Sequence, residues 1–149
     1  MLQPKNTKFK KVQNKKIKKK FSYQSCLTMN YKSRRSIFVF SKESGVITSI
    51  QLEIGKKLIQ KILNKVGSVF LSSFPQVPVS KKPIGVRIGK GKGSVSFWVS
   101  KVNYGQKLFE IKSTEKNYSI ITQVVKGLSK KFPIKLALRN KHSTKVWLN

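Results

Sequence analysis

Residues 81–111 read KKPIGVRIGKGKGSVSFWVSKVNYGQKLFEI, a basic, glycine-rich loop followed by two runs in which apolar and polar residues alternate. The runs at 95–102 and 107–111 have the period of two that is typical of β-strands. The turn-forming sequence NYG at 103–105 separates them. This pattern predicts a β-hairpin, and it predicts that the loop at 81–94 emerges from a sheet.

The loop holds cations and spaced glycines but no acidic residue. Because glycine offers no side chain to bury and loses the most backbone entropy on folding, such a loop needs an outside partner to become ordered. Lysine and arginine on a glycine-rich backbone suit a surface of phosphates, so we expect the loop to contact RNA. A flexible, solvated hairpin loop is the alternative. The loop cations are Lys81, Lys82, Arg87, Lys90 and Lys92.

The glycine spacing does not fit two common nucleotide-binding motifs. A Walker loop needs four residues between its first glycine and a Gly-Lys-Ser/Thr sequence, whereas three residues separate Gly85 from Gly89 and a glycine follows Lys90. A dinucleotide fingerprint opens a helix, but the β-prone run at 95–99 follows this loop. Both motifs are therefore excluded.

The composition is that of a protein that faces a polyanion. The 149 residues include 33 Lys+Arg and 4 Asp+Glu, which gives a formal net charge of +29. A free domain with this charge repels itself, so most of the cations are expected to lie against phosphates. The longest apolar runs are too short to cross a bilayer, so we expect no membrane span.

Groups that could carry out catalysis or bind a metal are scarce. The chain has no Asp, one Cys and one His, which excludes an internal disulfide and a four-ligand zinc site. We therefore expect no enzymatic activity, no cofactor and no metal. A Cys26–His142 nucleophilic pair is the catalytic alternative, but no third group that would orient it is evident.

Two amphipathic helices are expected. The first covers 48–66, where Thr48 and Gln51 have the spacing of a capping box and lysines face away from an apolar stripe. The second covers 116–131 and is ended by Pro133.

Strands are expected at 37–40, 68–74 and 134–139, with a turn at Gly45. Between 75 and 83, three prolines indicate a stiff extended arm that presents the loop. The order of the elements predicts an α+β domain with two amphipathic helices packed on a mostly antiparallel sheet.

We divide the chain into a basic N-terminal extension at 1–35, an α+β domain at 36–139 and a basic C-terminal tail at 140–149. The first 20 residues contain nine lysines and no acidic residue, so they are expected to be disordered until phosphates neutralise them. A solubility tail and a polybasic membrane anchor are the alternatives.

Five blocks of sequence carry a more specific signal. They are 1–5 with 7–9 (MLQPK and TKF), 82–83 with 86–93 (KP and VRIGKGKG), 97–99 (FWV), 108–111 (LFEI) and 131–135 (KFPIK). Together, in this order, they resemble the bacterial-type large-subunit ribosomal protein sixteen. Asn6 stands where that family usually has arginine, and Ile88 where it has methionine, so contacts at these two positions are not transferred.

The resemblance implies an α+β ribosomal protein whose partners are large-subunit ribosomal RNA, neighbouring large-subunit proteins and the aminoacyl-site transfer RNA near the peptidyl transferase centre. It implies no catalytic step, and we expect no homo-oligomer. The expected ribosomal RNA-binding residues are Lys5, Lys8, Lys10, Lys11, Lys15, Lys16, Arg34 and Arg35. The loop residues expected near the transfer RNA are Lys81, Lys82, Arg87, Gly89, Lys90, Gly91, Lys92 and Gly93.

Lysine greatly outnumbers arginine, isoleucine and asparagine are plentiful, and the family's starting motif begins at Met1. AT-rich coding inside an organelle produces these features, so we expect a protein of the mitochondrial matrix, in the mitochondrial ribosome. A plastid and a bacterial cytoplasm are the alternatives. A nucleoid-type DNA-packing protein would share the charge, but it would not need a single glycine-lysine loop.

Overall fold

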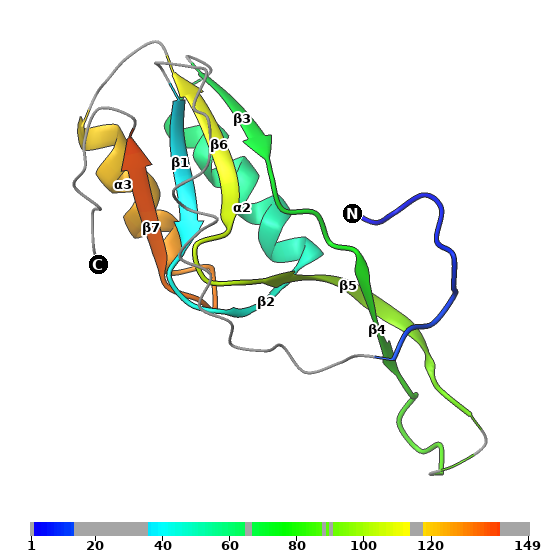
Figure 1. The fold of residues 1–149 in the computed structure, drawn as a ribbon. Helices are drawn as coiled ribbons and strands as arrows, with labels where there is room; N and C mark the ends of the chain where they lie inside the picture. Colours follow the sequence, from blue (N-terminus) through cyan, green and yellow to red (C-terminus); the bar gives the residue numbers. More distant parts are fainter. Residues whose placement is uncertain are drawn as a thin grey trace.

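The computed structural model describes residues 2–13, 36–64, 67–87, 89, 91–113 and 118–140. These residues form two helices and seven strands (Figure 1). In chain order the elements are β1 (Ser36–Ser41), β2 (Gly45–Thr48), α2 (Ser49–Ile62), β3 (Gly67–Leu71), β4 (Val77–Lys81), β5 (Ser94–Val102), β6 (Lys107–Ser113), α3 (Tyr118–Ser129) and β7 (Leu136–Asn140).

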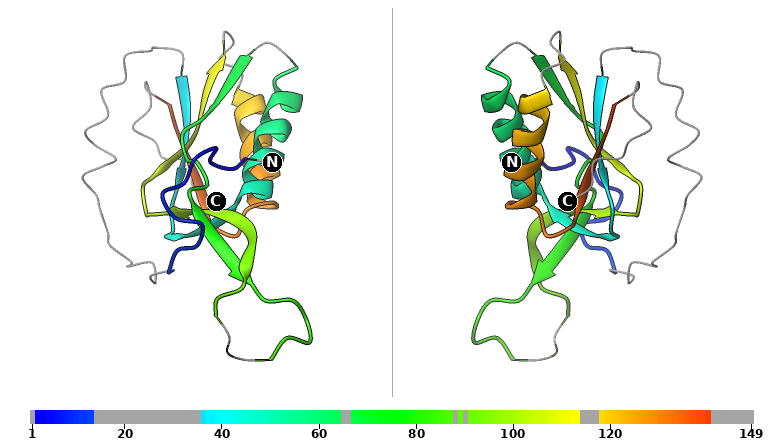
Figure 2. Two further views of the ribbon diagram at one scale, coloured as in Figure 1. Left: turned by 90° about the vertical axis from the view of Figure 1, so that its right-hand side faces the viewer. Right: turned by 90° about the vertical axis from the view of Figure 1, so that its left-hand side faces the viewer.

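The strands form two antiparallel sheets. One has four strands in the order β3-β6-β1-β7, and the other has three in the order β2-β5-β4. Both helices cover the same face of the four-stranded sheet (Figure 2). The predicted α+β class, the antiparallel pairing and the two packed helices are confirmed, but the strands are divided between two sheets.

The first helix begins where the sequence predicts. The Gln51 amide donates to Thr48 Oγ1 at 3.2 Å, and the Thr48 amide donates to Gln51 Oε1 at 2.9 Å, which completes the capping box. The helix ends at Ile62, earlier than predicted, because Asn64 takes a left-handed conformation with φ of 44° that interrupts the helix.

The core lies between the helices and the four-stranded sheet. Phe109 of β6 and Phe132 meet edge to face with ring centroids 6.0 Å apart. Gly55 lies against them, because a Cβ atom at this position would be 2.8 Å from the Phe132 ring. A larger residue at position 55 would therefore push α2 away from the sheet.

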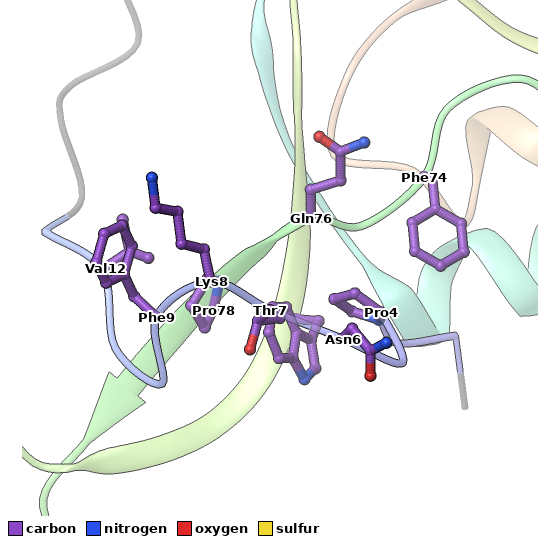
Figure 3. Close-up of a pocket in the computed structure, with 10 residues that line it drawn as sticks. Pro4, Asn6, Thr7, Lys8, Phe9, Val12, Phe74, Gln76 and Pro78 are labelled. Atoms are coloured by element: carbon purple, nitrogen blue, oxygen red, sulfur yellow. The ribbon is translucent and has the colours of Figure 1, made fainter.

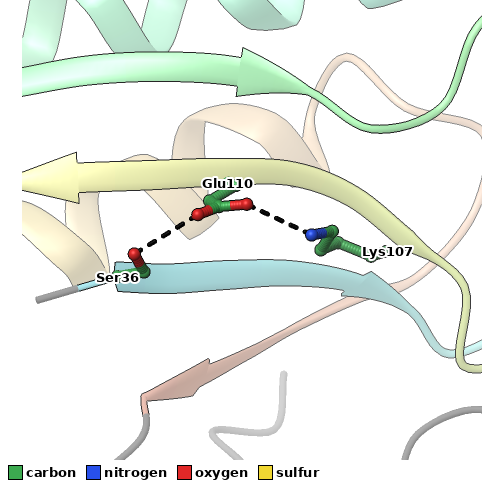
Figure 4. A network of polar contacts seen from close by, with 3 residues as sticks. All are labelled: Ser36, Lys107 and Glu110. Atoms are coloured by element: carbon green, nitrogen blue, oxygen red, sulfur yellow. Dashed lines mark hydrogen bonds and ion pairs between the residues drawn. The ribbon is translucent and has the colours of Figure 1, made fainter. Parts of the chain in front are cut away.

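On the four-stranded sheet, Glu110 is neutralised inside the domain (Figure 4). Ser36 Oγ donates to Glu110 Oε1 at 3.3 Å, and Lys107 Nζ lies 3.2 Å from Glu110 Oε2. A second carboxylate, that of Glu43, lies 3.0 Å from the ammonium nitrogen of Lys135. Both acidic side chains are therefore paired with lysines of the domain.

The predicted hairpin between 95–102 and 107–111 is wrong. β5 pairs with β2 and β4, whereas β6 pairs with β1 and β3 in the other sheet. The intervening turn is a corner between the sheets, because its main chain bonds to the corner between β1 and β2. The Gly105 amide donates to the Ser41 carbonyl at 2.8 Å, and the Ser41 amide donates to the Gln106 carbonyl at 3.0 Å.

Two short strands were not predicted. The residue expected to form a turn, Gly45, begins β2 and pairs with Val102 of β5. The segment expected to be a stiff, extended arm is extended, but it also contains β4, which pairs with β5 and places Pro78 opposite Trp98. A proline is tolerated in this strand because β4 is at the edge of its sheet.

Candidate nucleic-acid interface

The paired strands β4 and β5 form an arm that extends away from the helices and carries the loop at 82–93 at its end (Figures 1 and 2). The last pair of the arm joins Lys81 to Ser94. The loop therefore emerges from a sheet, as predicted, but it connects β4 to β5.

The structure favours glycine at two positions where the loop leads back into β5. A Cβ atom at Gly93 would lie 2.6 Å from the carbonyl oxygen of Lys81, so a side chain would collide with the opposite strand. Gly91 has a φ of 88°, a conformation that other residues rarely adopt. The Lys82 ammonium donates to the Gly89 carbonyl and ties the two sides of the loop together.

The N-terminal residues 2–13 lie beside the arm (Figure 2). Lys11 Nζ donates to the Lys92 carbonyl at 2.6 Å, and Lys92 Nζ donates to the Val12 carbonyl at 2.8 Å. At the other end of this segment, Leu2 packs against the core. Residues 2–13 are therefore attached to the domain at one end and to the loop at the other.

The N-terminal segment and the loop, which are hydrogen-bonded to each other, carry many of the predicted RNA-binding residues. The exposed cations of the N-terminal segment and the loop are Lys5, Lys8, Lys10, Lys11, Lys81, Arg87 and Lys92. Gly89 and Gly91 are exposed as well, whereas Lys82 and Gly93 are half-buried. The predicted residues Lys15, Lys16, Arg34, Arg35 and Lys90 lie outside the described residues.

A cavity between the N-terminal segment and the arm was not predicted (Figure 3). It has a volume of about 410 Å³ and is lined by ten residues of the N-terminal segment, the arm and the stretch just before β4, among them Phe9, Phe74, Pro78 and Trp98. Phe9 is 61% exposed and Phe74 is 42% exposed. Large aromatic residues within or beside basic, extended stretches were the available sequence signal, but their proximity depends on the fold.

The N-terminal segment and the arm contain basic side chains and no acidic ones. All four acidic residues, Glu43, Glu53, Glu110 and Glu115, lie outside the N-terminal segment and the arm. Among the described residues, no group of three or more His, Cys, Asp or Glu side chains is placed to hold a metal ion. Within the same part of the chain, no helix has both the length and the hydropathy that crossing a bilayer requires.

Comparison with known proteins assigns the family. Residues 4–139 match the family model described as ribosomal protein L16p/L10e. A protein of Acinetobacter baylyi named large ribosomal subunit protein uL16 is 34% identical over 138 residues, which cover 93% of this chain and 96% of that protein. Its namesake in Maricaulis maris is 37% identical over 135 residues, which cover 91% and 93%. The chain therefore belongs to the ribosomal protein L16p/L10e family.

Proposed function

We propose that this chain is a structural constituent of the large ribosomal subunit, that it binds large-subunit ribosomal RNA through residues 2–13 and the arm, and that its loop helps to position aminoacyl-site transfer RNA near the peptidyl transferase centre. Membership of the family makes the chain a ribosomal protein, and the relatives carry the name of a large-subunit protein. Other large-subunit proteins are its expected neighbours.

The observation that carries the proposal is the continuity of the cationic surface. The exposed lysines Lys5, Lys8 and Lys10 lie on a segment that is hydrogen-bonded to the loop through Lys92. No acidic side chain interrupts either segment. Each phosphate that such a surface neutralises releases counterions, which supports binding to folded RNA over binding to a neutral partner.

The test is sedimentation of the tagged chain from cell lysates at moderate salt, with sequencing of the RNA in each fraction. The wild-type chain should migrate with large-subunit RNA and with whole ribosomes. Replacing four exposed lysines of the N-terminal segment by alanine should move much of it to the top of the gradient. Those lysines are Lys5, Lys8, Lys10 and Lys11.

A matched variant controls for the loss of charge. Alanine at four exposed lysines on or beside the helices, Lys57, Lys61, Lys126 and Lys130, removes the same charge away from the interface. This variant should still sediment with large-subunit RNA. Equal behaviour of the two variants would contradict the proposed interface. Migration with DNA, together with similar affinities for duplex DNA and structured RNA, would favour the nucleoid-type alternative.

For the compartment, we propose the mitochondrial matrix. The support is compositional, since all but four of the basic residues are lysines, as AT-rich organellar coding would favour. The four arginines are Arg34, Arg35, Arg87 and Arg139. Fractionation of cells that carry the tagged chain should recover it in mitochondrial ribosomes. Recovery in plastid ribosomes, or in those of a bacterial cytoplasm, would contradict this part of the proposal.

A further inference from the structure

We propose that the cavity between the N-terminal segment and the arm receives an unpaired nucleobase of an RNA strand. This inference rests on the proposed function, because it names the part of the RNA that the cationic surface would hold there. The cavity would add stacking on a base to the phosphate contacts proposed above.

The walls of the cavity come from two segments. The N-terminal segment contributes Phe9 and Lys8, and the arm and the residues before it contribute Phe74, Pro78 and Trp98. Pro78 and Trp98 are direct partners across β4 and β5, so this wall is part of a sheet. Figure 3 shows Phe9 and Phe74 on opposite sides of the group of labelled residues.

The chemistry of the walls fits a base better than an aliphatic ligand. Aromatic faces stack on any nucleobase, and each stacked base contributes about 1–3 kcal/mol. Asn6, Thr7 and Gln76 also line the cavity and carry groups that can donate to and accept from the edge of a base. The volume of about 410 Å³ lies within the range of small-ligand pockets.

The charge around the cavity selects a nucleotide within an anionic chain. Lys8 Nζ lies 5.6 Å from the centre of the Phe9 ring, so an ammonium group is next to the stacking surface. Lys10 and Lys11 follow Phe9 directly and are exposed. A base stacked beside Phe9 would therefore have its flanking phosphates near several lysines, whereas a proline-rich peptide would leave this charge without a partner.

The exposure of Phe9 is itself an argument for a ligand. A phenylalanine that remains 61% exposed, in a segment otherwise dominated by lysine and polar residues, contributes little to the stability of the free protein. Covering the ring with a base would remove this apolar surface from water. Because Phe9 is not part of the core, it can be replaced without unfolding the domain.

The first experiment compares an oligoribonucleotide with an abasic strand that has the same number of phosphates. Trp98 and Trp147 are the two tryptophans, so a full-length chain with Trp147→Phe reports on the cavity by fluorescence. The intact strand should quench Trp98 and bind about fivefold tighter or more, the ratio that corresponds to stacking one base. Equal affinity for both strands, with no quenching, would overturn the inference.

Two alanine variants test whether the preference arises in the cavity. Phe9→Ala should reduce the base preference about fivefold and leave the salt dependence unchanged, because no charge is lost. Phe70→Ala is the matched control, since Phe70 is a 49% exposed phenylalanine on β3, and it should keep the full preference. A base preference that survives in Phe9→Ala, or that falls equally in both variants, would overturn the inference.

A second experiment uses assembled particles, so that its failure is distinguishable from failure of the proposed function. A photoreactive phenylalanine analogue replaces Phe9 in the tagged chain, and particles containing the chain are isolated by sedimentation before irradiation. Cross-linking to an unpaired nucleotide would support the inference. Cross-linking to a neighbouring protein would overturn it while leaving the chain a ribosomal protein.

Discussion

Lys11 and Lys92, 81 residues apart in the sequence, each donate a hydrogen bond to the main chain of the other's segment. The ammonium group of Lys11 donates to the main-chain carbonyl of Lys92 at 2.6 Å, and that of Lys92 donates to the carbonyl of Val12 at 2.8 Å. Lys92 Nζ also lies 3.3 Å from Gln13 Oε1. Main-chain and amide oxygens thus take the place of carboxylates in a region that has none. The N-terminal segment and the loop consequently form one continuous surface.

Lys92→Ala should detach the N-terminal segment from the loop. Spin labels at positions 10 and 94, in a Cys26→Ser background, should give a narrow distance distribution in the wild type and a broad one in this variant. Lys81→Ala is the control, because it removes the same charge from an exposed lysine at the base of the loop. Equally broad distributions in the two variants would contradict the connection.

Arg87 and Lys92 should have separable roles in translation. Arg87 is exposed, whereas the Lys92 ammonium is occupied by contacts to the N-terminal segment. Arg87→Ala should therefore weaken aminoacyl-transfer-RNA binding to purified particles about tenfold, the size of one hydrogen bond to a charged group.

In contrast, Lys92→Ala should mainly lower the fraction of the chain that is incorporated into particles, because it loosens the anchoring segment. Filter binding of transfer RNA and gradient sedimentation measure the two effects separately. Normal transfer-RNA binding by Arg87→Ala particles would argue against a role of the loop at the aminoacyl site.

The two helix glycines should respond differently to alanine. A Cβ atom at Gly55 would lie 2.8 Å from the Phe132 ring and 3.1 Å from Phe109, both of which are held in the core. Gly55→Ala should lower the free energy of unfolding by roughly 1–2 kcal/mol, because overpacking outweighs the gain in helix propensity.

At Gly127, the nearest atom to an added Cβ would be a terminal methyl carbon of Leu58, at 2.9 Å. A leucine side chain can rotate away, so Gly127→Ala should change the free energy of unfolding by less than about 0.5 kcal/mol or increase it. Urea denaturation of both variants provides the comparison. Equal losses of stability would mean that the Leu58 side chain is held as firmly as the Phe132 ring.

Glu43 should give a small, pH-dependent contribution to stability. Its hydrogen bond with Lys135 lowers the pKa of the Glu43 carboxyl, against the opposing effect of desolvation. A carboxyl with a lowered pKa stabilises the folded state above its unfolded pKa of about 4.3, and this contribution disappears as the pH falls through the folded value.

Both side chains are largely exposed, so salt should screen their interaction. Glu43→Gln should slightly lower the urea midpoint at neutral pH and low ionic strength. It should have no effect in strong acid or in high salt. A difference that persists in acid would show that Glu43 acts through something other than its charge.

Local signals in the sequence were sufficient for the helices and the fold class. The capping box of Thr48 and Gln51 depends on residues three positions apart, so it can be read directly from the chain. Strand pairing was harder, because the NYG turn has the same local sequence whether the next strand returns or crosses to another sheet. The pairing of β5 with β2 and β4 determines that the chain crosses to the other sheet. These two strands were not predicted, because Gly45 and Pro78 are unusual residues in a strand.

The sequence predicted which charged residues the candidate site contains, but not how the fold brings them together. The lysines of the N-terminal segment and the loop are evident from composition. The contact between Lys11 and Lys92 and the cavity beside Phe9 depend on long-range packing that no short pattern encodes. The RNA-binding roles of all the predicted site residues stay predictions, and Lys15, Lys16, Arg34, Arg35 and Lys90 also lie outside the described residues.

The length of β5 limits where the loop can act. This strand has nine residues between the loop and the corner at 103–106, so at about 3.4 Å per residue it is roughly 30 Å long. Under the proposed function, the loop and the corner would meet RNA features separated by about that distance. Two extra residues in both β4 and β5 would keep every side chain on its own face and move the loop outward by roughly 7 Å. In the proposed function, arm length would thus determine which part of a folded RNA the loop reaches.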